Sequence, residues 1–174
     1  EVVKAAAQKK VPGYDKKGDM HYDVISAFIK SMRGSDVKAT LYYLSRMIDA
    51  GEDPKFIARR MVIFASEDIG LAGNGALALA VATFQAVERV GLPEASYNLY
   101  HCATALARSK KSRETTELMH VAQGLARRYP DAPVPLHIRN APTKLMKDLG
   151  YGKDYKWQAD FKHKKGFLPD EIRD

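Results

Sequence analysis

The stretch that decides the fold is residues 14–36, which reads YDKKGDMHYDVISAFIKSMRGSD. Its first six residues are polar and typical of a turn, and the segment that follows spaces apolar residues along one side of a helix. Those apolar residues are Val24, Ile25, Phe28, Ile29 and Met32. Gly34 ends this helix, and either Ser35 or Asp36 is suited to cap the next one by accepting an orphan backbone N–H. The stretch therefore predicts a domain boundary, a first helix and a tight turn into a second.

Five further segments up to residue 128 carry helical patterns. Gly51 ends the second helix, and Asp53 and Pro54 suit the cap and first position of the third, which we expect to reach residue 69. The segment 76–90 is apolar all round, so we expect burial on most of its sides. A fifth helix is expected to end near residue 109 and a sixth to span about 112–128. Short turns between the helices predict an all-α antiparallel helical array.

The character of the chain changes after residue 128. Half of its eight prolines fall between residues 130 and 142, so this segment cannot be helical. Val134, Leu136 and Ile138 alternate with other residues, which suits an extended strand or arm. Thr143 is expected to cap a short helix, and the aromatic, basic tail from residue 151 looks irregular. We predict three parts: the end of an upstream helix at residues 1–13, a helical domain at 14–128, and a Pro-rich arm, short helix and tail at 129–174 packed on it.

The composition is that of an ordinary folded protein, with 45% hydrophobic and 28% charged residues in 174. A single cysteine, Cys102, excludes an internal disulfide and fits a reducing cytosol. The apolar run 69–87 contains too many glycines and polar residues to span a membrane.

The net charge of +7 is unevenly distributed. Residues 108–165 hold 14 Lys and Arg against 6 Asp and Glu, a net charge of +8, so the rest of the chain is nearly neutral. This favours an acidic partner such as nucleic acid, while a solvated basic surface without a partner is the alternative.

Several motifs of catalysis are missing from the sequence. It contains no GxxxxGK[ST] phosphate loop, no HExxH, no CxxC and no GxSxG. The five histidines are scattered, without ligand spacing. We therefore predict no catalytic residue, no metal and no cofactor in this chain.

Glu67 and Asp68 stand at the end of the predicted third helix, where acidic side chains oppose the helix dipole. One explanation is an ion pair within the chain or a cap to the following loop. The other is an acid–base patch, formed with Arg59 and Arg60, in a self-complementary subunit interface. These four residues are our candidates for an oligomer interface.

Basic and polar residues of the second half are candidates for contact with nucleic acid or a partner. Aromatic residues lie between them, and aromatic rings stack on unpaired bases. The alternative is internal: the prolines order an arm in which Arg139 satisfies helix C-terminal carbonyls, and the aromatic residues anchor the tail. The candidates are Lys110, Lys111, Arg113, His137, Arg139, Asn140, Lys144, Lys147, Lys153 and Lys156.

Several ordered motifs carry a resemblance to a known family. Besides residues 14–36 they are AGEDP (50–54), FIARR (56–60), ASEDIGLA (65–72), PEA (93–95), ARSKKS (107–112), HIRNAPT (137–143), LMK (145–147) and GYGK (150–153). Over about residues 14–157 the chain resembles the C-terminal domain of the AAA+ ATPases called replication-associated recombination protein A, whose eukaryotic relative is the Werner helicase-interacting protein. Lys110, Lys111, Arg113 and the tail from residue 157 depart from the family pattern.

The resemblance implies an all-helical domain that follows the AAA+ module and its lid and is related to the clamp-loader collar. It implies homotetramers, DNA-dependent ATP hydrolysis at stalled forks and single-strand gaps, and single-stranded-DNA-binding protein as a partner. ATP and Mg would belong to the AAA+ module, outside this chain, and the location would be the cytoplasm, at the nucleoid. We therefore expect a non-catalytic oligomerisation domain. The alternative is a module that binds single-stranded or forked DNA without self-assembly.

Overall fold

The structure is a computed structural model that describes residues 18–173. Contacts divide it between Leu118 and Met119 into two compact units, which we call the helical unit (18–118) and the C-terminal unit (119–173). The predicted helix remnant at 1–13 and the first residues of the predicted turn lie outside the described residues. The predicted boundary after residue 128, and the packing of the arm on the helical domain, stay predictions.

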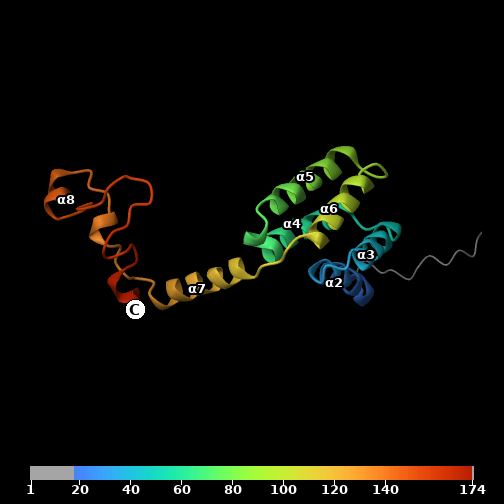
Figure 1. Cartoon of the computed structure of the whole chain (residues 1–174), viewed down its shortest axis with the longest axis horizontal. Helices are drawn as coiled ribbons and strands as arrows, with labels where there is room; N and C mark the ends of the chain where they lie inside the picture. Colours follow the sequence, from blue (N-terminus) through green and yellow to red (C-terminus); the bar gives the residue numbers. More distant parts are fainter. Residues whose placement is uncertain (1–17, 174) are drawn as a thin grey trace, which may run out of the picture. The chain divides into compact units, whose positions relative to one another are not determined.

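The described residues form seven α-helices and no strand, which confirms the predicted all-α class (Figure 1). The helical unit contains α2 (Asp19–Arg33), α3 (Val37–Asp49), α4 (Pro54–Phe64), α5 (Gly75–Val90) and α6 (Ser96–Arg108). α2 packs on α3, and α4 packs on α5. α6 contacts all four of these helices and is therefore the centre of the unit.

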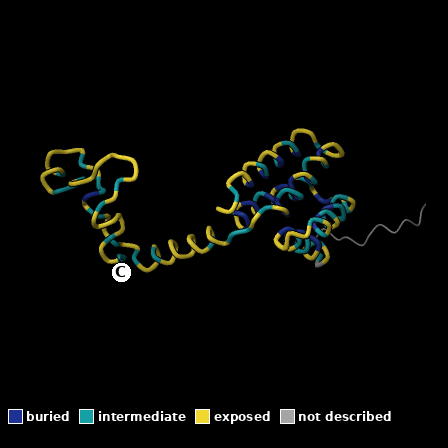
Figure 2. Tube along the Cα trace, in the orientation of Figure 1, coloured by how far each residue is buried: buried dark blue, intermediate teal, exposed yellow. Residues whose placement is uncertain are grey.

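Small residues let the other helices approach α6 closely. Cys102, Ala103 and Ala107 of this helix are fully buried, as are the larger Leu99 and Leu106. In the helical unit, the dark blue residues of Figure 2 lie on the inner sides of the helices. The predicted apolar stripe of the first helix faces this core, since Phe28 and Met32 have no exposed surface.

Side-chain caps begin two helices as predicted. The Asp36 carboxylate accepts a 2.9 Å hydrogen bond from the Ala39 N–H, so Asp36 rather than Ser35 caps α3. The Asp53 carboxylate accepts one from the Lys55 N–H, and Pro54 takes the first position of α4.

The predicted third helix is shorter than expected. α4 ends at Phe64 and continues as a π-helical segment, η1 (Ala65–Ile69), and a 3₁₀ turn, η2 (Gly70–Ala72). Gly70 has φ +47°, and a Cβ atom on it would lie 2.7 Å from Thr115 Oγ1. The chain therefore turns at a residue whose missing side chain lets the start of α7 come close.

The prediction that the segment 76–90 is buried on most sides is wrong. Only Ala76, Ala80, Thr83 and Val87 of α5 are buried, while Leu77 and Val81 are 43% and 38% exposed. α4, η1 and α6 are the described elements that pack most extensively on α5, and they bury one side of it. The other side, with Leu77 and Val81, stays exposed. Its uniform apolar composition therefore leaves an apolar side exposed.

The C-terminal unit is built differently. α7 (Glu114–Arg128) begins in the helical unit, continues into the C-terminal unit and buries none of its residues. After it come η3 (Leu136–Ile138), α8 (Lys144–Asp148) and η4 (Asp170–Ile172), joined by irregular segments. Thr143 caps α8 as predicted, accepting from the Met146 N–H at 3.2 Å. The only buried residue of the described part of this unit is His137.

Of the extended strand or arm predicted at 134–138, the strand is not formed. Pro135 and Arg139 are extended, as an arm requires, but the residues between them form the 3₁₀ turn η3. A strand needs a hydrogen-bonded neighbour, and prolines 133 and 135 lack the N–H that a ladder uses. The alternation of apolar residues therefore reflects a turn rather than a sheet.

Candidate functional site

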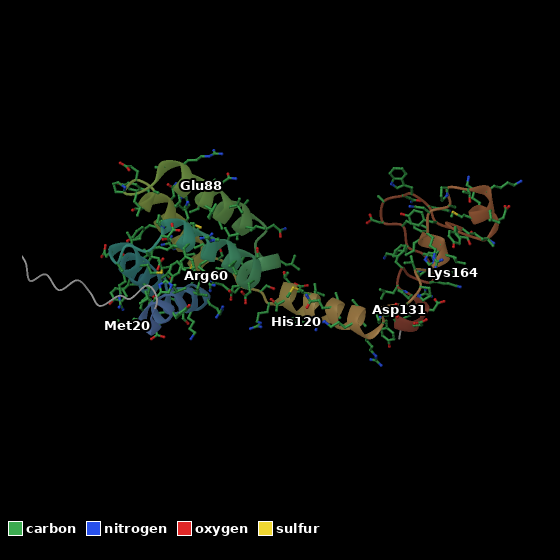
Figure 3. All side chains as sticks on the ribbon, turned by 180° about the vertical axis from the view of Figure 1, so that it is seen from behind. Met20, Arg60, Glu88, His120, Asp131 and Lys164 are labelled. Carbon is green, nitrogen blue, oxygen red and sulfur yellow. The ribbon has the colours of Figure 1, made fainter. Side chains whose placement is uncertain are left out.

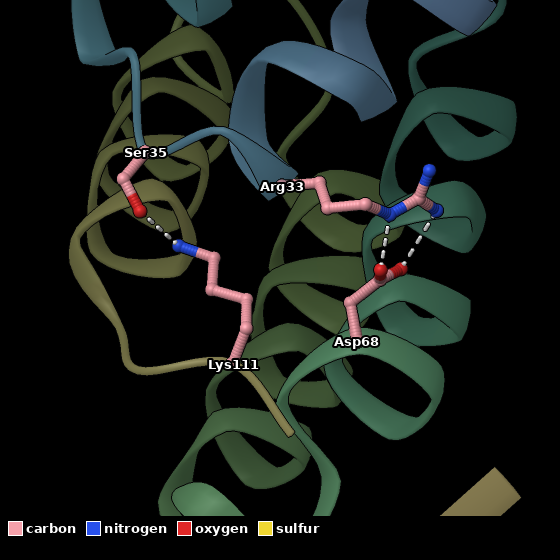
Figure 4. A network of polar contacts seen from close by, with 4 residues as sticks. All are labelled: Arg33, Ser35, Asp68 and Lys111. Carbon is pink, nitrogen blue, oxygen red and sulfur yellow. Dashed lines mark hydrogen bonds and ion pairs between the residues drawn. The ribbon is translucent and has the colours of Figure 1, made fainter. Parts of the chain in front are cut away.

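A bidentate ion pair joins two parts of the helical unit that are far apart in the sequence (Figure 4). Arg33 is the last residue of α2, and its Nε and Nη2 atoms donate to the two carboxylate oxygens of Asp68 in η1, the second at 3.2 Å. Asp68 is 8% exposed, and its hydrogen bond raises the pKa of Arg33 against the opposing effect of burial. The acid at the helix end is therefore compensated within the chain. Glu67 beside it is exposed to water.

The loop after α6 completes this polar network. Lys111 Nζ donates to Ser35 Oγ at 2.9 Å and to the Ala107 carbonyl at 2.6 Å. Burial lowers the pKa of Lys111, and the attraction of Asp68 acts in the opposite direction. The Ser112 N–H also donates to the Asp68 carbonyl at 2.8 Å. Lys111, a predicted nucleic-acid contact, thus uses its ammonium group to fasten this loop, whereas Lys110 and Arg113 are exposed.

The predicted interface residues Arg59 and Arg60 lie on α4. Arg59 is exposed, and Arg60 is half-buried within the body of the helical unit (Figure 3). Arg60 Nε is buried and has no hydrogen-bond partner among residues 18–173. The Asp68 carboxylate is paired with Arg33 of α2. Within one chain it is therefore bonded to neither Arg59 nor Arg60. Their role in an interface stays a prediction.

A second buried acid, Glu52, was not predicted from the sequence. His21 Nδ1 lies 2.9 Å from Glu52 Oε2, and Glu52 Oε1 accepts from the Asp53 N–H at 3.0 Å. Glu52 is 7% exposed. No spacing in the sequence points from His21 to Glu52 or from Arg33 to Asp68, because these pairs form only once the helices pack.

In the C-terminal unit, two predicted contact residues are engaged internally. His137 Nε2 donates to the Gly166 carbonyl at 2.8 Å, and its ring stacks 3.8 Å from that of His163. Arg139 Nε donates to the Val134 carbonyl at 2.6 Å, and its guanidinium group lies over the Tyr151 ring. Arg139 therefore orders the arm, although the carbonyl it satisfies belongs to the arm itself and not to a helix end.

Two cavities flank His137. One has a volume of about 340 Å³, and four cationic side chains line it, namely Lys153, Lys164, Lys165 and Arg173. The other has a volume of about 450 Å³, and its lining includes Asn140, Tyr155 and Phe167.

The cavities bring together only some of the predicted contacts. His137, Arg139, Asn140 and Lys153 line one or the other, whereas the exposed Lys144, Lys147 and Lys156 line neither. Lys164, Lys165 and Arg173 were not among the candidates. Lys164 and Lys165 belong to the basic tail whose interleaved aromatic residues favour single-stranded DNA, whereas nothing in the sequence pointed to Arg173.

No helix of the described part is long and apolar enough to cross a membrane. Comparison with known proteins finds that two family models match the chain, and the one that matches residues 1–33 is described as "AAA C-terminal domain". Residues 34–174 match the model "MgsA AAA+ ATPase C terminal". The chain belongs to this family of C-terminal domains, as the resemblance predicted.

Three curated relatives illustrate the match. The chain is 46% identical to the ATPase WRNIP1 of Dictyostelium discoideum over 92% of its length and 19% of that protein. It is 42% identical to replication-associated recombination protein A of Escherichia coli K12, over 92% of the chain and 36% of that protein. The Bacillus subtilis protein of the same name is 40% identical, over 99% of the chain and 42% of that protein. The chain thus spans less than half of the length of each of these relatives.

The junction of the two family matches falls inside a packed structure. Arg33 is the last residue of the first match, and Asp68 lies in the second. α2 contacts α3 and α6, so this helix is part of the helical unit. The Arg33–Asp68 ion pair therefore ties the two matched regions together.

Proposed function

We propose that this chain is the non-catalytic oligomerisation domain of an AAA+ ATPase that acts in DNA replication, recombination and repair. Its relatives carry the names of replication-associated recombination proteins and of an ATPase. ATP and Mg would be held, and ATP hydrolysed, by an AAA+ module outside this chain. A homotetramer, a collar-like arrangement and contact with single-stranded-DNA-binding protein follow from the family resemblance.

The observation that carries the proposal is the exposed apolar surface of α7. Leu118, Met119 and Val121 are 56%, 47% and 61% exposed, and no residue of the helix is buried. The helix has 15 residues and includes Gly124. An isolated helix of this length is marginal in water, and an internal glycine weakens it by about 1 kcal/mol. Burial of these apolar side chains against a partner surface would therefore stabilise α7.

A second copy of the chain is the partner that we propose. α5 exposes Leu77 and Val81, and Ile63 and Leu71 nearby in sequence are 46% and 54% exposed. Two apolar surfaces on one chain allow each copy both to offer and to receive an apolar helix, as a closed ring requires. Burying these side chains between copies would remove them from water at about 25 cal/mol per Å².

Sedimentation velocity of variants tests this proposal. We expect Leu118→Glu and Val121→Glu to dissociate the assembly, because each would bury an unpaired carboxylate. Gln123→Glu is the matched control: it adds the same charge to an exposed polar position of the same helix and should leave the assembly intact. Equal sedimentation of all these variants, with helix content unchanged by circular dichroism, would contradict an interface at α7.

A second candidate function is favoured by the cationic cavity of the C-terminal unit. The chain would then be a module that binds single-stranded or forked DNA, with or without self-assembly. Lys and Arg side chains gathered around a cavity neutralise phosphates and release their counterions. Binding that weakens steeply with salt supports this function, and absence of binding at low salt rules it out.

A further inference from the structure

A tight turn presents two lysines in the C-terminal unit. The Gly166 N–H donates to the His163 carbonyl at 2.8 Å, and Gly166 has φ +64°, which closes the turn. Lys164 and Lys165 occupy its two central positions (Figure 3 labels Lys164). Their ammonium groups therefore extend from one short, closed segment of chain.

Two stacked histidines hold this turn in place. The rings of His137 and His163 lie 3.8 Å apart at 16°, and His137 Nε2 donates to the carbonyl of Gly166. His163 Nδ1 accepts from the Lys165 N–H at 3.2 Å. Both ends of the turn are thus fixed to the one buried residue of the described part of the unit.

The cavity beside this turn has an excess of positive charge. Its acidic residues are Asp154 and Asp170, and Asp170 is already paired with Arg173. Three lysines, at 153, 164 and 165, therefore face a single remaining carboxylate. A cavity of about 340 Å³ with this charge suits a phosphate group.

The second cavity, which His137 also lines, supplies a different chemistry. Tyr155 and Phe167 line it and are 49% and 46% exposed, so part of each ring is open to a flat ligand. The side chain of Asn140, which lines the same cavity, has an amide that can donate and accept hydrogen bonds. Two residues beyond Tyr155, Trp157 is fully exposed. Exposed rings beside a basic groove are the arrangement on which unpaired bases stack.

We propose that the two cavities together form one binding site for single-stranded nucleic acid. A backbone phosphate lies among Lys153, Lys164 and Lys165, and the adjoining unpaired base lies against Tyr155 and Phe167. His137 lines both cavities. An acidic peptide would satisfy the lysines but would leave the rings uncovered, so the observations favour nucleic acid. The inference rests on the second candidate function and is independent of self-assembly.

Fluorescence anisotropy with a labelled oligothymidine of about 15 nucleotides tests the phosphate part. In the whole chain, the double variant Lys164→Gln and Lys165→Gln should bind the oligothymidine about tenfold more weakly. The slope of log K against log salt concentration should be smaller in magnitude by about 1.4. The double variant Lys38→Gln and Lys55→Gln removes the same charge from exposed positions of α3 and α4, outside both cavities, and should change affinity about twofold at most. Equal losses in the two double variants would overturn the site and leave only diffuse attraction. No binding of the wild-type chain at low salt would overturn the second candidate function as well.

Competition experiments test the base part. An abasic oligonucleotide of the same length keeps every phosphate but has no rings to stack, so we expect about tenfold weaker binding. Equal binding of the abasic strand would overturn the base cavity. Displacement of the probe by polyglutamate of equal charge would assign the surface to an acidic peptide instead. Displacement by inorganic phosphate at the same concentration of phosphate groups would reduce it to a site for free phosphate, and either result would overturn the proposal.

Discussion

Arg33 and Asp68 hold the end of α2 against the π-helical segment through two parallel hydrogen bonds. Asp68 is buried, whereas the side chain of Arg33 is 47% exposed. The carboxylate of Asp68 thus lies inside the unit, and the guanidinium group of Arg33 binds it from the surface. Because the Ser112 N–H also bonds to the Asp68 carbonyl, one residue fixes both α2 and the loop before α7.

Replacing Arg33 by methionine should destabilise the helical unit. The variant keeps the apolar stem but removes the donors, which leaves a buried carboxylate without its charged partner. We expect a loss of about 1–3 kcal/mol in the free energy of unfolding, measured by urea denaturation. Arg89→Met is the control, because Arg89 also lies in the last turn of a helix, and the loss of its interaction with the helix dipole is comparable. Equal losses in the two variants would contradict a structural role for the ion pair.

Gly70→Ala should destabilise the same region by a different route. Gly70 has a positive φ, and an added Cβ would press on Thr115 Oγ1. With ψ −125° at this positive φ, a residue with a side chain is strained by about 1–3 kcal/mol, before any adjustment of Thr115. Gly75→Ala is the matched control, since nothing lies within 4 Å of its added Cβ. Thermal unfolding should show a lower midpoint for Gly70→Ala alone; a midpoint equal to that of the control would contradict the close approach.

Several helices of both units could be predicted because local rules agree with the structure. Asp36, Asp53 and Thr143 cap helices as their chemistry indicates, and Phe28 and Met32 lie in the core that their spacing predicts. Features that depend on residues close together in the sequence, such as helix caps and an apolar stripe, were thus predicted correctly.

What could not be predicted depends on residues far apart in the chain. The partner of Asp68 lies 35 residues away, on another helix. The exposed side of α5 follows from which helices reach it, which its apolar sequence does not encode. Lys164 and Lys165 lie in one turn that the stacking of His137 on His163 holds in place, and that contact also had no sequence signal.

Cys102 should react slowly while the protein is folded. Burial raises the pKa of its thiol, and a hydrogen bond with Thr83 opposes this only in part. Less of the reactive thiolate is therefore present at about pH 8 than in the unfolded chain. We expect slow reaction with a disulfide reagent in buffer and fast reaction in denaturant; equal rates would contradict burial of the thiol.

The same shift predicts how stability changes with pH. Because the folded pKa lies above the unfolded value, the unfolded state loses this proton first as pH rises. The contribution of the Cys102 proton to the free energy of unfolding is fully present below the ordinary pKa of the thiol, about 9, and declines as pH rises above it. Cys102→Ala should remove this part of the decline in urea titrations at high pH. A decline of the same size in the variant would assign it to other groups.

The central claim is that copies of this chain assemble, and the mass of the unmodified chain in solution tests it most directly. Sedimentation equilibrium at tens of micromolar should give a mass that is a multiple of the 19.4 kDa of one chain, with four copies expected from the family resemblance. A single species at 19.4 kDa across that concentration range would contradict the claim.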